Sequence, residues 1–167
     1  MGQYYFIFNQ ALCIKCNSCV IGCKSKNKSI DVKLRKLLPE PLSISCNHCK
    51  NPTCKEVCPV GAINKNQDNG IVTIDPESCI GCKRCSQICL YQAPSFSKVK
   101  EKAYKCDLCQ NKLKVGKSPL CVERCMTGAL KIKKEYELTE GEIGILRSKQ
   151  LPYVKITNPA YILKSAK

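Results

Sequence analysis

The sequence predicts an α+β fold of two related units, in which short strands and helices surround bound metal. Three observations lead to this prediction. The 167 residues are only 6% aromatic and include no tryptophan, which leaves little for a conventional hydrophobic core. The 16 cysteines are a density typical of disulfide scaffolds or of metal-loaded proteins. These cysteines also fall into four groups that repeat, namely Cys13, Cys16, Cys19, Cys23; Cys46, Cys49, Cys54, Cys58; Cys79, Cys82, Cys85, Cys89; and Cys106, Cys109, Cys121, Cys125.

The groups reveal an internal duplication. A shift of 66 positions places Cys13-Ile14 and the rest of the first group on Cys79-Ile80 and the rest of the third. A shift of 67 positions places residues 52–63 of the second group on residues 119–130 of the fourth, with matching proline, cysteine, glutamate, glycine and alanine residues. The first and third groups are therefore one motif used twice, and so are the second and fourth.

Two short helices are predicted at the second and fourth groups. Asn51-Pro52 and Ser118-Pro119 each place an N-cap residue before a proline at the first helical position. We expect helices of one or two turns there, which carry the last two cysteines of their groups and end at Gly61 and Gly128.

Strands are predicted on either side of these helices. The opening residues 1–9 read as a strand, and apolar stretches follow the helices at 62–63 and 129–132. The alternating run 71–74 follows an Asn69-Gly70 turn signal. Each half of the chain therefore reads as strand, cysteine loop, helix, strand.

Two segments lie outside this pattern. Residues 31–41 are interpreted as a linker, either irregular or forming a short helix packed on the cysteine sites. Residues 133–167 contain no cysteine, and their polar, basic composition with Pro152 and Pro159 predicts an extended tail. Such a tail is either frayed or docked on a partner.

The cysteine spacing predicts cubane iron–sulfur clusters. The run Cys-x2-Cys-x2-Cys-x3-Cys occurs at 13–23 and at 79–89. In such a run three thiolates bind three iron corners, and the fourth reaches the neighbouring cluster in two-cluster ferredoxins. The groups at 46–58 and 106–125 widen the gap before the third cysteine without changing the count. Four groups of four predict four [4Fe-4S] clusters.

Zinc and disulfides are the alternatives. Zinc usually takes two Cys-x2-Cys pairs and has no use for a third cysteine two residues later. A secreted disulfide scaffold should begin with a leader, whereas this chain opens with a strand-like run. Its apolar runs are far shorter than the roughly 20 residues that cross a bilayer. These points predict a soluble protein of the reducing cytoplasm, without direct membrane insertion.

The formal charge of +15 counts every cysteine as neutral. Sixteen thiolates contribute −16 and four cluster cores of about +2 contribute +8, so the loaded protein carries about +7. Lysines gather at 24–28, 98–105 and 131–134, either to steer an acidic redox partner or to offset the cluster charge. Nucleic acid is not an expected partner, because the protein has few arginines and scattered tyrosines.

The motifs resemble a known family. Residues 43–62 read Ser-Ile-Ser-Cys-Asn-His-Cys-x2-Pro-x-Cys-x3-Cys-Pro-x-Gly-Ala, followed by Cys79-Ile80-Gly81-Cys82, Lys105-Cys106-Asp107-x-Cys109 and Cys121-Val122-Glu123-x-Cys125. They are similar to the four-cluster electron-transfer subunits of molybdenum and tungsten oxidoreductases, which include the iron–sulfur subunit of dimethyl sulfoxide reductase. The similarity covers roughly residues 1–132. A short loop after Cys23 favours the small polyferredoxin subunit of a tungsten aldehyde oxidoreductase.

The resemblance implies two pseudo-symmetric ferredoxin-like units. Residues 1–41 with 98–132 would form one unit from the first and fourth cysteine groups. Residues 42–97 would form the inserted unit, and residues 133–167 the tail. The implied ligand sets are Cys13, Cys16, Cys19 and Cys125; Cys23, Cys106, Cys109 and Cys121; Cys46, Cys49, Cys54 and Cys89; and Cys58, Cys79, Cys82 and Cys85. Spacing alone equally allows two ferredoxins in series.

These features predict an electron-transfer subunit rather than an enzyme. No catalytic triad, phosphate loop or dinucleotide fingerprint is present, and sixteen ligands leave no iron site open to substrate. One cluster would face a larger molybdenum- or tungsten-pterin catalytic subunit, and the far end a soluble ferredoxin or another redox protein. The alternative is a free-standing soluble polyferredoxin. His48, the single histidine, either forms a loop hydrogen bond or tunes the nearest cluster.

Overall fold

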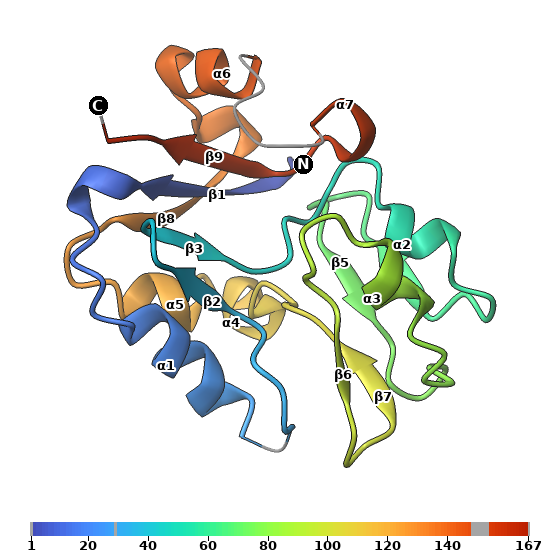
Figure 1. Ribbon diagram of the computed structural model, residues 1–167. Helices are drawn as coiled ribbons and strands as arrows, with labels where there is room; N and C mark the ends of the chain where they lie inside the picture. Colours follow the sequence, from blue (N-terminus) through green and yellow to red (C-terminus); the bar gives the residue numbers. More distant parts are fainter. Residues whose placement is uncertain (1, 29, 148–153, 167) are drawn as a thin grey trace.

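Short helices and strands alternate along the protein in the computed structural model, which describes residues 2–28, 30–147 and 154–166 (Figure 1). The α-helices are α1 (Ser18–Lys26), α2 (Thr53–Glu56), α3 (Arg84–Ile88), α4 (Gln110–Lys114), α5 (Leu120–Glu123), α6 (Glu140–Arg147) and α7 (Val154–Thr157). The strands are β1 (Tyr4–Asn9), β2 (Lys36–Leu38), β3 (Leu42–Ile44), β4 (Ile63–Lys65), β5 (Val72–Ile74), β6 (Ser95–Ser97), β7 (Lys102–Tyr104), β8 (Leu130–Lys134) and β9 (Tyr161–Lys164). Two 3-10 helices, η1 (Gln10–Leu12) and η2 (Glu135–Glu137), follow β1 and β8. This mixture of helices and small sheets is of the predicted α+β class.

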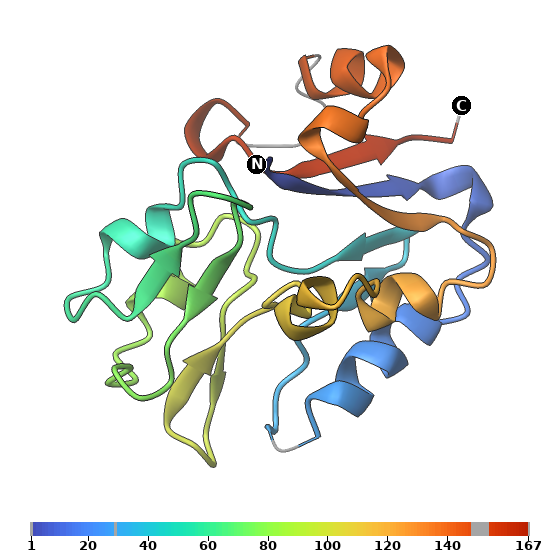
Figure 2. The same cartoon turned by 180° about the vertical axis from the view of Figure 1, so that it is seen from behind.

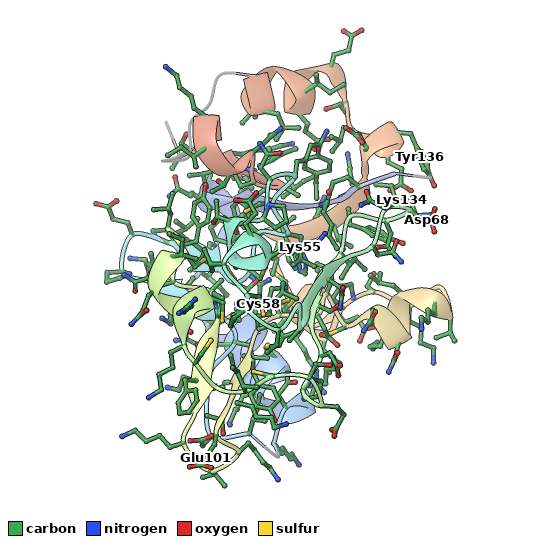
Figure 3. All side chains as sticks on the ribbon, turned by 90° about the vertical axis from the view of Figure 1, so that its right-hand side faces the viewer. Lys55, Cys58, Asp68, Glu101, Lys134 and Tyr136 are labelled. Atoms are coloured by element: carbon green, nitrogen blue, oxygen red, sulfur yellow. The ribbon has the colours of Figure 1, made fainter. Side chains whose placement is uncertain are left out.

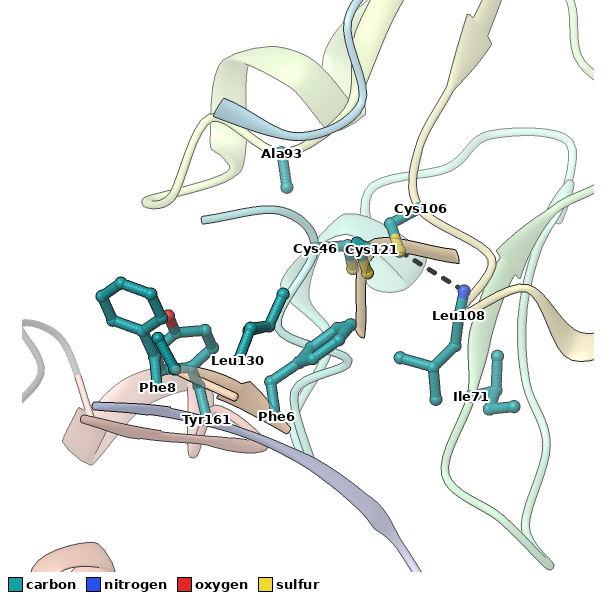
Figure 4. Close-up of a cluster of buried hydrophobic side chains, with 11 residues drawn as sticks. Phe6, Phe8, Cys46, Ile71, Ala93, Cys106, Leu108, Cys121, Leu130 and Tyr161 are labelled. Carbon is teal, nitrogen blue, oxygen red and sulfur yellow. Dashed lines mark hydrogen bonds between the residues drawn. The ribbon is translucent and has the colours of Figure 1, made fainter. Parts of the chain in front are cut away.

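The largest sheet has the strand order β8-β1-β9. β8 is antiparallel to β1, and β9 is parallel to it. Successive side chains of a strand point to opposite faces. Phe6 and Phe8 pack in the core that contains buried cysteines (Figure 4), while Tyr5 and Ile7 pack with side chains of α6 and β9. The predicted N-terminal strand is therefore buried on both faces, which explains its continuous run of apolar residues.

The remaining strands form three hairpins, β2–β3, β4–β5 and β6–β7. Figures 1 and 2 show the large sheet with α1, α4 and α5 on one side of the molecule, and α2, α3 and strands β4 to β7 on the other. Hairpins β2–β3 and β6–β7 each end two residues before a Cys-x2-Cys pair, at Cys46 and at Cys106.

The duplicated motifs share a strand register. Ile63 of β4 lies opposite Ile74 of β5, and Leu130 of β8 lies opposite Phe8 of β1. Leu130 is 67 positions after Ile63, and Ile74 is 66 positions after Phe8, the same shifts that relate the cysteine groups. The bounds of α2 and α5 also differ by 67, and α3 begins 66 positions after α1. The duplication thus extends from the sequence to the local structure.

The two proline-led helices form as predicted but end earlier than predicted. α2 and α5 have one turn each, and the N-cap residues are Pro52 and Pro119 themselves. Both helices end before the last cysteine of their group. Gly61 and Gly128 lie in the turns that follow, with φ of 65° and 66°, a conformation that glycine adopts without steric cost. These glycines end turns, not helices.

Residues 31–41 do not form a helix. Their second half is β2, which pairs with β3 so that Leu37 lies opposite Ser43. Leu34 and Arg35, just before β2, are buried. Hydrogen bonding to β3 satisfies the backbone of this segment, and a helix is not required.

The prediction of an extended tail is wrong for the described part of residues 133–167. α6 covers one face of the sheet and β9 completes its edge (Figure 1). The N–H of Ala160 donates to the carbonyl of Asn47 at 2.9 Å, and the carbonyl of Ala160 accepts from Phe6 N–H at 3.1 Å. Pro159 lies between α7 and β9, and Pro152 lies outside the described residues.

Candidate iron–sulfur cluster sites

Four cysteines from two groups line one pocket. This pocket is lined by Cys46, Cys49, Cys54 and Cys89. Hairpin β2–β3 leads into Cys46, α2 carries Cys54, and Cys89 directly follows α3. Because α2 packs against α3, the last cysteine of the third group joins the first three of the second. The resemblance implied the same four residues for one cluster.

A second pocket is lined by Cys58, Cys79, Cys82 and Cys85. Cys58 follows α2, and its position is labelled in Figure 3. Cys79 and Cys82 lie in the loop before α3, and Cys85 is on α3. This pocket again combines the second and third groups, in the complementary set.

The first and fourth groups meet where α1 packs against α5. Burial and the neighbouring Cys106, Cys121 and Cys109 thiolates together raise the pKa of the Cys23 thiol to about 12. Cys23 is on α1 and Cys121 on α5. These four cysteines therefore lie within electrostatic reach of one another, as the implied ligand set requires.

The last implied set is more open. Cys13, Cys19 and Cys125 pack against the core formed around Phe6, and Cys16 is exposed. Cys19 is on α1 and Cys125 directly follows α5, so the α1–α5 contact also serves this set.

The four sets differ in depth. Cys46, Cys106 and Cys121 belong to one buried core (Figure 4), whereas Cys16 and Cys82 are exposed. We call Cys46/Cys49/Cys54/Cys89 and Cys23/Cys106/Cys109/Cys121 the interior sets. The other two are called the outer sets.

The cysteine loops have the same backbone conformation in both copies. Lys15 and Asn17 have φ of 57° and 61°, and Gly81 and Lys83 at the equivalent positions have 71° and 63°. Positive φ is uncommon for residues other than glycine and recurs at functional loops. The repetition shows that the tight Cys-x2-Cys-x2-Cys turn imposes this conformation.

Backbone amides donate to the cysteine sulfurs. The N–H of His48 donates to Cys46 Sγ at 3.4 Å. The N–H of Leu108 donates to Cys106 Sγ, also at 3.4 Å (Figure 4). His48 and Leu108 occupy equivalent positions of their Cys-x2-Cys pairs. N–H donors favour the thiolate form and tune the reduction potential of a bound cluster.

Burial keeps several thiols protonated in the unloaded protein. Burial, together with the neighbouring Cys46 thiolate, raises the pKa of Cys49 and of Cys54 to about 12. Ligation requires thiolates, so metal binding here must release protons and supply positive charge.

His48 is buried and neutral. Its Nδ1 accepts a hydrogen bond from Val72 N–H at 3.0 Å. Burial, together with the nearby Lys105, Lys65 and Arg35, holds the pKa of His48 well below its usual value. Of the two predicted roles, the structure shows the loop hydrogen bond.

Two buried cations were not singled out by sequence reasoning. Lys105 was assigned to a surface lysine group, yet it is 6% exposed, and Arg35 is 1% exposed. The other lysine groups are nearer the surface, where Lys26 pairs with Asp107 at 2.7 Å and Lys133 with Glu142 at 2.9 Å. The position of Lys105 directly before Cys106 was the available signal.

The pockets fit clusters better than single ions. Among the described residues, no three His, Cys, Asp or Glu side chains converge closely enough to hold one metal ion. Each pocket is instead lined by four thiols, the number of ligands that a cluster with four iron corners requires.

Comparison with known proteins decides the family. The family described as "4Fe-4S dicluster domain" matches residues 40–135, which include the last three cysteine groups. The protein belongs to this 4Fe-4S dicluster family. [4Fe-4S] clusters are accordingly its cofactor.

This 4Fe-4S dicluster protein also has relatives along its whole length. The B subunit of the anaerobic dimethyl sulfoxide reductase of Escherichia coli is 34% identical, over 97% of this sequence and 88% of the relative. The same subunit of Haemophilus influenzae is 34% identical over 100% of this sequence and 91% of the relative. Protein NrfC of Escherichia coli is 34% identical, over 77% of this sequence and 64% of its own length. In the described part of this dicluster protein, no helix is both long and apolar enough to cross a bilayer.

Proposed function

We propose that this protein is an electron-transfer subunit that carries four [4Fe-4S] clusters. It relays electrons between a larger catalytic subunit with a molybdenum or tungsten pterin and an external redox partner. When bound, each cluster accepts and donates one electron. The polypeptide itself holds the clusters, excludes water from the interior sets and directs amide hydrogen bonds to the sulfurs.

The observation that carries the proposal is the composition of the two pockets. Each is lined by four cysteines, three from one group and one from another, with no cysteine shared between the pockets. This division is typical of two-cluster ferredoxins, in which the fourth cysteine of a run serves the neighbouring cluster. The eight cysteines of the second and third groups would thus hold two clusters.

The first and fourth groups support a second pair of clusters by the same logic. α1 packs on α5 as α3 packs on α2, and the register of β8–β1 repeats that of β4–β5. We therefore infer two pseudo-symmetric ferredoxin-like units, residues 1–41 with 98–132 and residues 42–97. The described part of 133–167 packs on both.

The partner is inferred from the relatives. Two of them are subunits of anaerobic dimethyl sulfoxide reductases, and the match extends over nearly all of this sequence. We also propose a tungsten aldehyde oxidoreductase as the catalytic partner. We place the protein in the reducing cytoplasm, because its sixteen cysteines form no disulfide.

Anaerobic purification tests the proposal. We expect about sixteen irons per protein molecule, broad absorption bleached by dithionite, and co-purification from native cells with a larger pterin-containing protein. Zinc in place of iron would contradict the cluster assignment. Full iron in a protein that always isolates as a monomer would favour the free-standing polyferredoxin.

Cysteine variants test the ligand sets. The double variant C49S/C54S should lose one cluster, and adding C89S should remove no further iron, because Cys89 serves the same cluster. Adding C23S instead should remove about four more irons. Two ferredoxins in series predict the reverse, since Cys23 would then share the cluster of Cys49 and Cys54.

A further inference from the structure

Arg35 and Lys105 are the only lysine or arginine residues that are buried in the described part of the protein. Neither is within 4 Å of a carboxylate oxygen in the described residues, where the ion pairs involve other lysines. A buried charge is strongly unfavourable unless an opposite charge and hydrogen bonds compensate for its lost hydration. Each of these cations therefore needs a counter-charge from another source.

Arg35 is held by neutral groups. Its Nη1 donates to Ser43 O at 3.1 Å and Ser43 Oγ at 2.9 Å, and Nη2 donates to Ser45 Oγ at 2.8 Å. The guanidinium lies over the ring of Phe6, 4.5 Å from its centroid. Nε has no hydrogen-bond partner among the described residues. The site fixes the position of the charge without neutralising it.

The negative groups that act on Arg35 include three cysteines of one interior set. Burial lowers the pKa of Arg35, but Cys121 and Cys106, as thiolates, raise it most strongly, followed by Tyr161 and Cys23. In the reverse direction, Arg35 lowers the pKa of each of these three thiols, against the larger effect of burial. Three of the four cysteines of this set thus face the guanidinium charge.

Lys105 is the buried cation at the other interior set. Its side chain lines the pocket of Cys46, Cys49, Cys54 and Cys89. Nζ donates to the carbonyls of Val72 and of Cys106, again neutral groups. Its positive charge lowers the pKa of Cys54, although burial raises that pKa more strongly.

We propose that Arg35 and Lys105 are the resident counter-charges of the two interior clusters, and that each raises the reduction potential of its own cluster. This inference rests on the proposed function and adds a role for two residues that are not ligands. Four thiolates and an oxidised core of +2 sum to −2, and the reduced cluster carries −3. A fixed positive charge in a low-dielectric interior favours the more negative form. The step is the gain of one electron from the redox partner, and no bond or proton changes.

The consequence is a higher reduction potential for each interior cluster. The interior clusters, each with a buried cation, bind an electron more strongly than the same clusters would without it. Arg35 and Lys105 act on the cluster from outside the ligand shell and are positioning residues.

Redox titration monitored by electron paramagnetic resonance, on anaerobically purified, fully loaded protein, tests the inference. Arg35→Gln is expected to lower the reduction equilibrium constant of one cluster by more than tenfold, which is 59 mV for one electron. Lys105→Gln should do the same to a different cluster. The matched controls are Lys36→Gln and Lys100→Gln, which remove the same charge from exposed positions nearby and should shift every potential by less than threefold.

Full iron with four unchanged potentials in both Gln variants would overturn the counter-charge role and leave the proposed function intact. Iron far below sixteen per molecule in the wild type would instead contradict the proposed function. If Arg35→Gln fails to assemble a cluster, the Arg35→Lys variant distinguishes a requirement for positive charge from a structural role of Arg35. Full iron and wild-type potentials in Arg35→Lys support a requirement for charge, and failure of both variants assigns Arg35 a structural role and overturns the proposal.

Discussion

Gly22 of α1 lies against Arg124, the residue that follows α5. A Cβ atom built on Gly22 would lie 3.0 Å from Cγ of Arg124 and 3.3 Å from the carbonyl oxygen of Leu120. A larger residue at this position requires Arg124 or the backbone of α5 to shift by a few tenths of an ångström or more. The contact lies between the two helices that bring the first and fourth cysteine groups together.

Gly22→Val should therefore separate α1 from α5. We expect a loss of roughly 1–3 kcal/mol in the free energy of unfolding, the usual cost of overpacking, and fewer irons bound per molecule. Anaerobic thermal unfolding and iron analysis measure both effects. Gly144→Ala in α6 is the control, because its Cβ meets nothing within 4 Å and helix propensity favours alanine. An equally stable, fully loaded Gly22→Val protein would show that the helices do not hold these groups together.

Gly81 and Lys15 occupy equivalent positions in the two Cys-x2-Cys-x2-Cys loops, but only Gly81 is sterically confined. A Cβ on Gly81 would lie 2.2 Å from the backbone oxygen of Glu101. We predict that Gly81→Asn loses one cluster, although asparagine tolerates positive φ. Lys15→Gly should keep all iron, since it only removes a strained side chain. Iron content and absorption of the two purified variants check this, and full loading of Gly81→Asn would contradict it.

Glu142 joins three elements of the C-terminal segment through a carboxylate that is 5% exposed. Oε2 accepts from Lys133 Nζ at 2.9 Å, and Oε1 from Lys164 Nζ at 2.9 Å. Burial alone would raise its pKa, but the two lysines and Thr139 N–H lower the pKa to about 2, from 4.5. A depressed folded-state pKa contributes stability above pH 4.5, and this contribution disappears as the pH falls toward 2.

Glu142→Gln should thus lower the free energy of unfolding near pH 7 by at most about 3 kcal/mol. The difference from wild type should stay constant between pH 6 and 8 and shrink below pH 4.5. Denaturant unfolding at several pH values measures this. Glu140→Gln, an exposed change in the same helical turn, is the control and should have little effect. A pH-independent difference would show that packing, not charge, accounts for the loss.

Thr157 connects the C-terminal segment to an interior set. Its hydroxyl hydrogen-bonds the Cys49 thiol and lies 2.9 Å from the hydroxyl of Tyr91. A hydrogen bond to a ligand sulfur stabilises the reduced cluster. Thr157→Val should lower the reduction equilibrium constant of one cluster by about fivefold, the equivalent of a hydrogen bond of about 1 kcal/mol.

Redox titration of Thr157→Val checks this prediction, with Thr73→Val on β5 as the control. The iron content of both variants should match that of the wild type. An unchanged potential in Thr157→Val would limit the C-terminal segment to a role in folding.

The sequence by itself determined the cofactor and the duplication. Thiolates that bind the corners of one cubane cluster must follow one another at short, fixed intervals. The spacing of the cysteines in Cys13 to Cys23 and in Cys79 to Cys89 therefore predicts the cluster from local sequence alone. The turn at Asn69-Gly70 was predictable for the same reason, because Gly70 adopts the positive φ that such a turn requires. The capping box of Thr139 and Glu142 at the start of α6 is a local signal of the same kind, which the prediction of an extended tail missed.

The tertiary structure decided what depends on residues far apart in the sequence. Whether Cys89 lines a pocket with Cys54 depends on α2 packing against α3. The spacing of the cysteines alone is compatible both with an inserted unit and with two ferredoxins in series. Burial of Arg35 follows from the pairing of β2 with β3, and the short edge strand β9 forms only because β1 offers it an open edge. Local sequence specifies turns and ligand spacing, whereas burial and pairing depend on the whole protein, because the energy comes from contacts that no single segment contains.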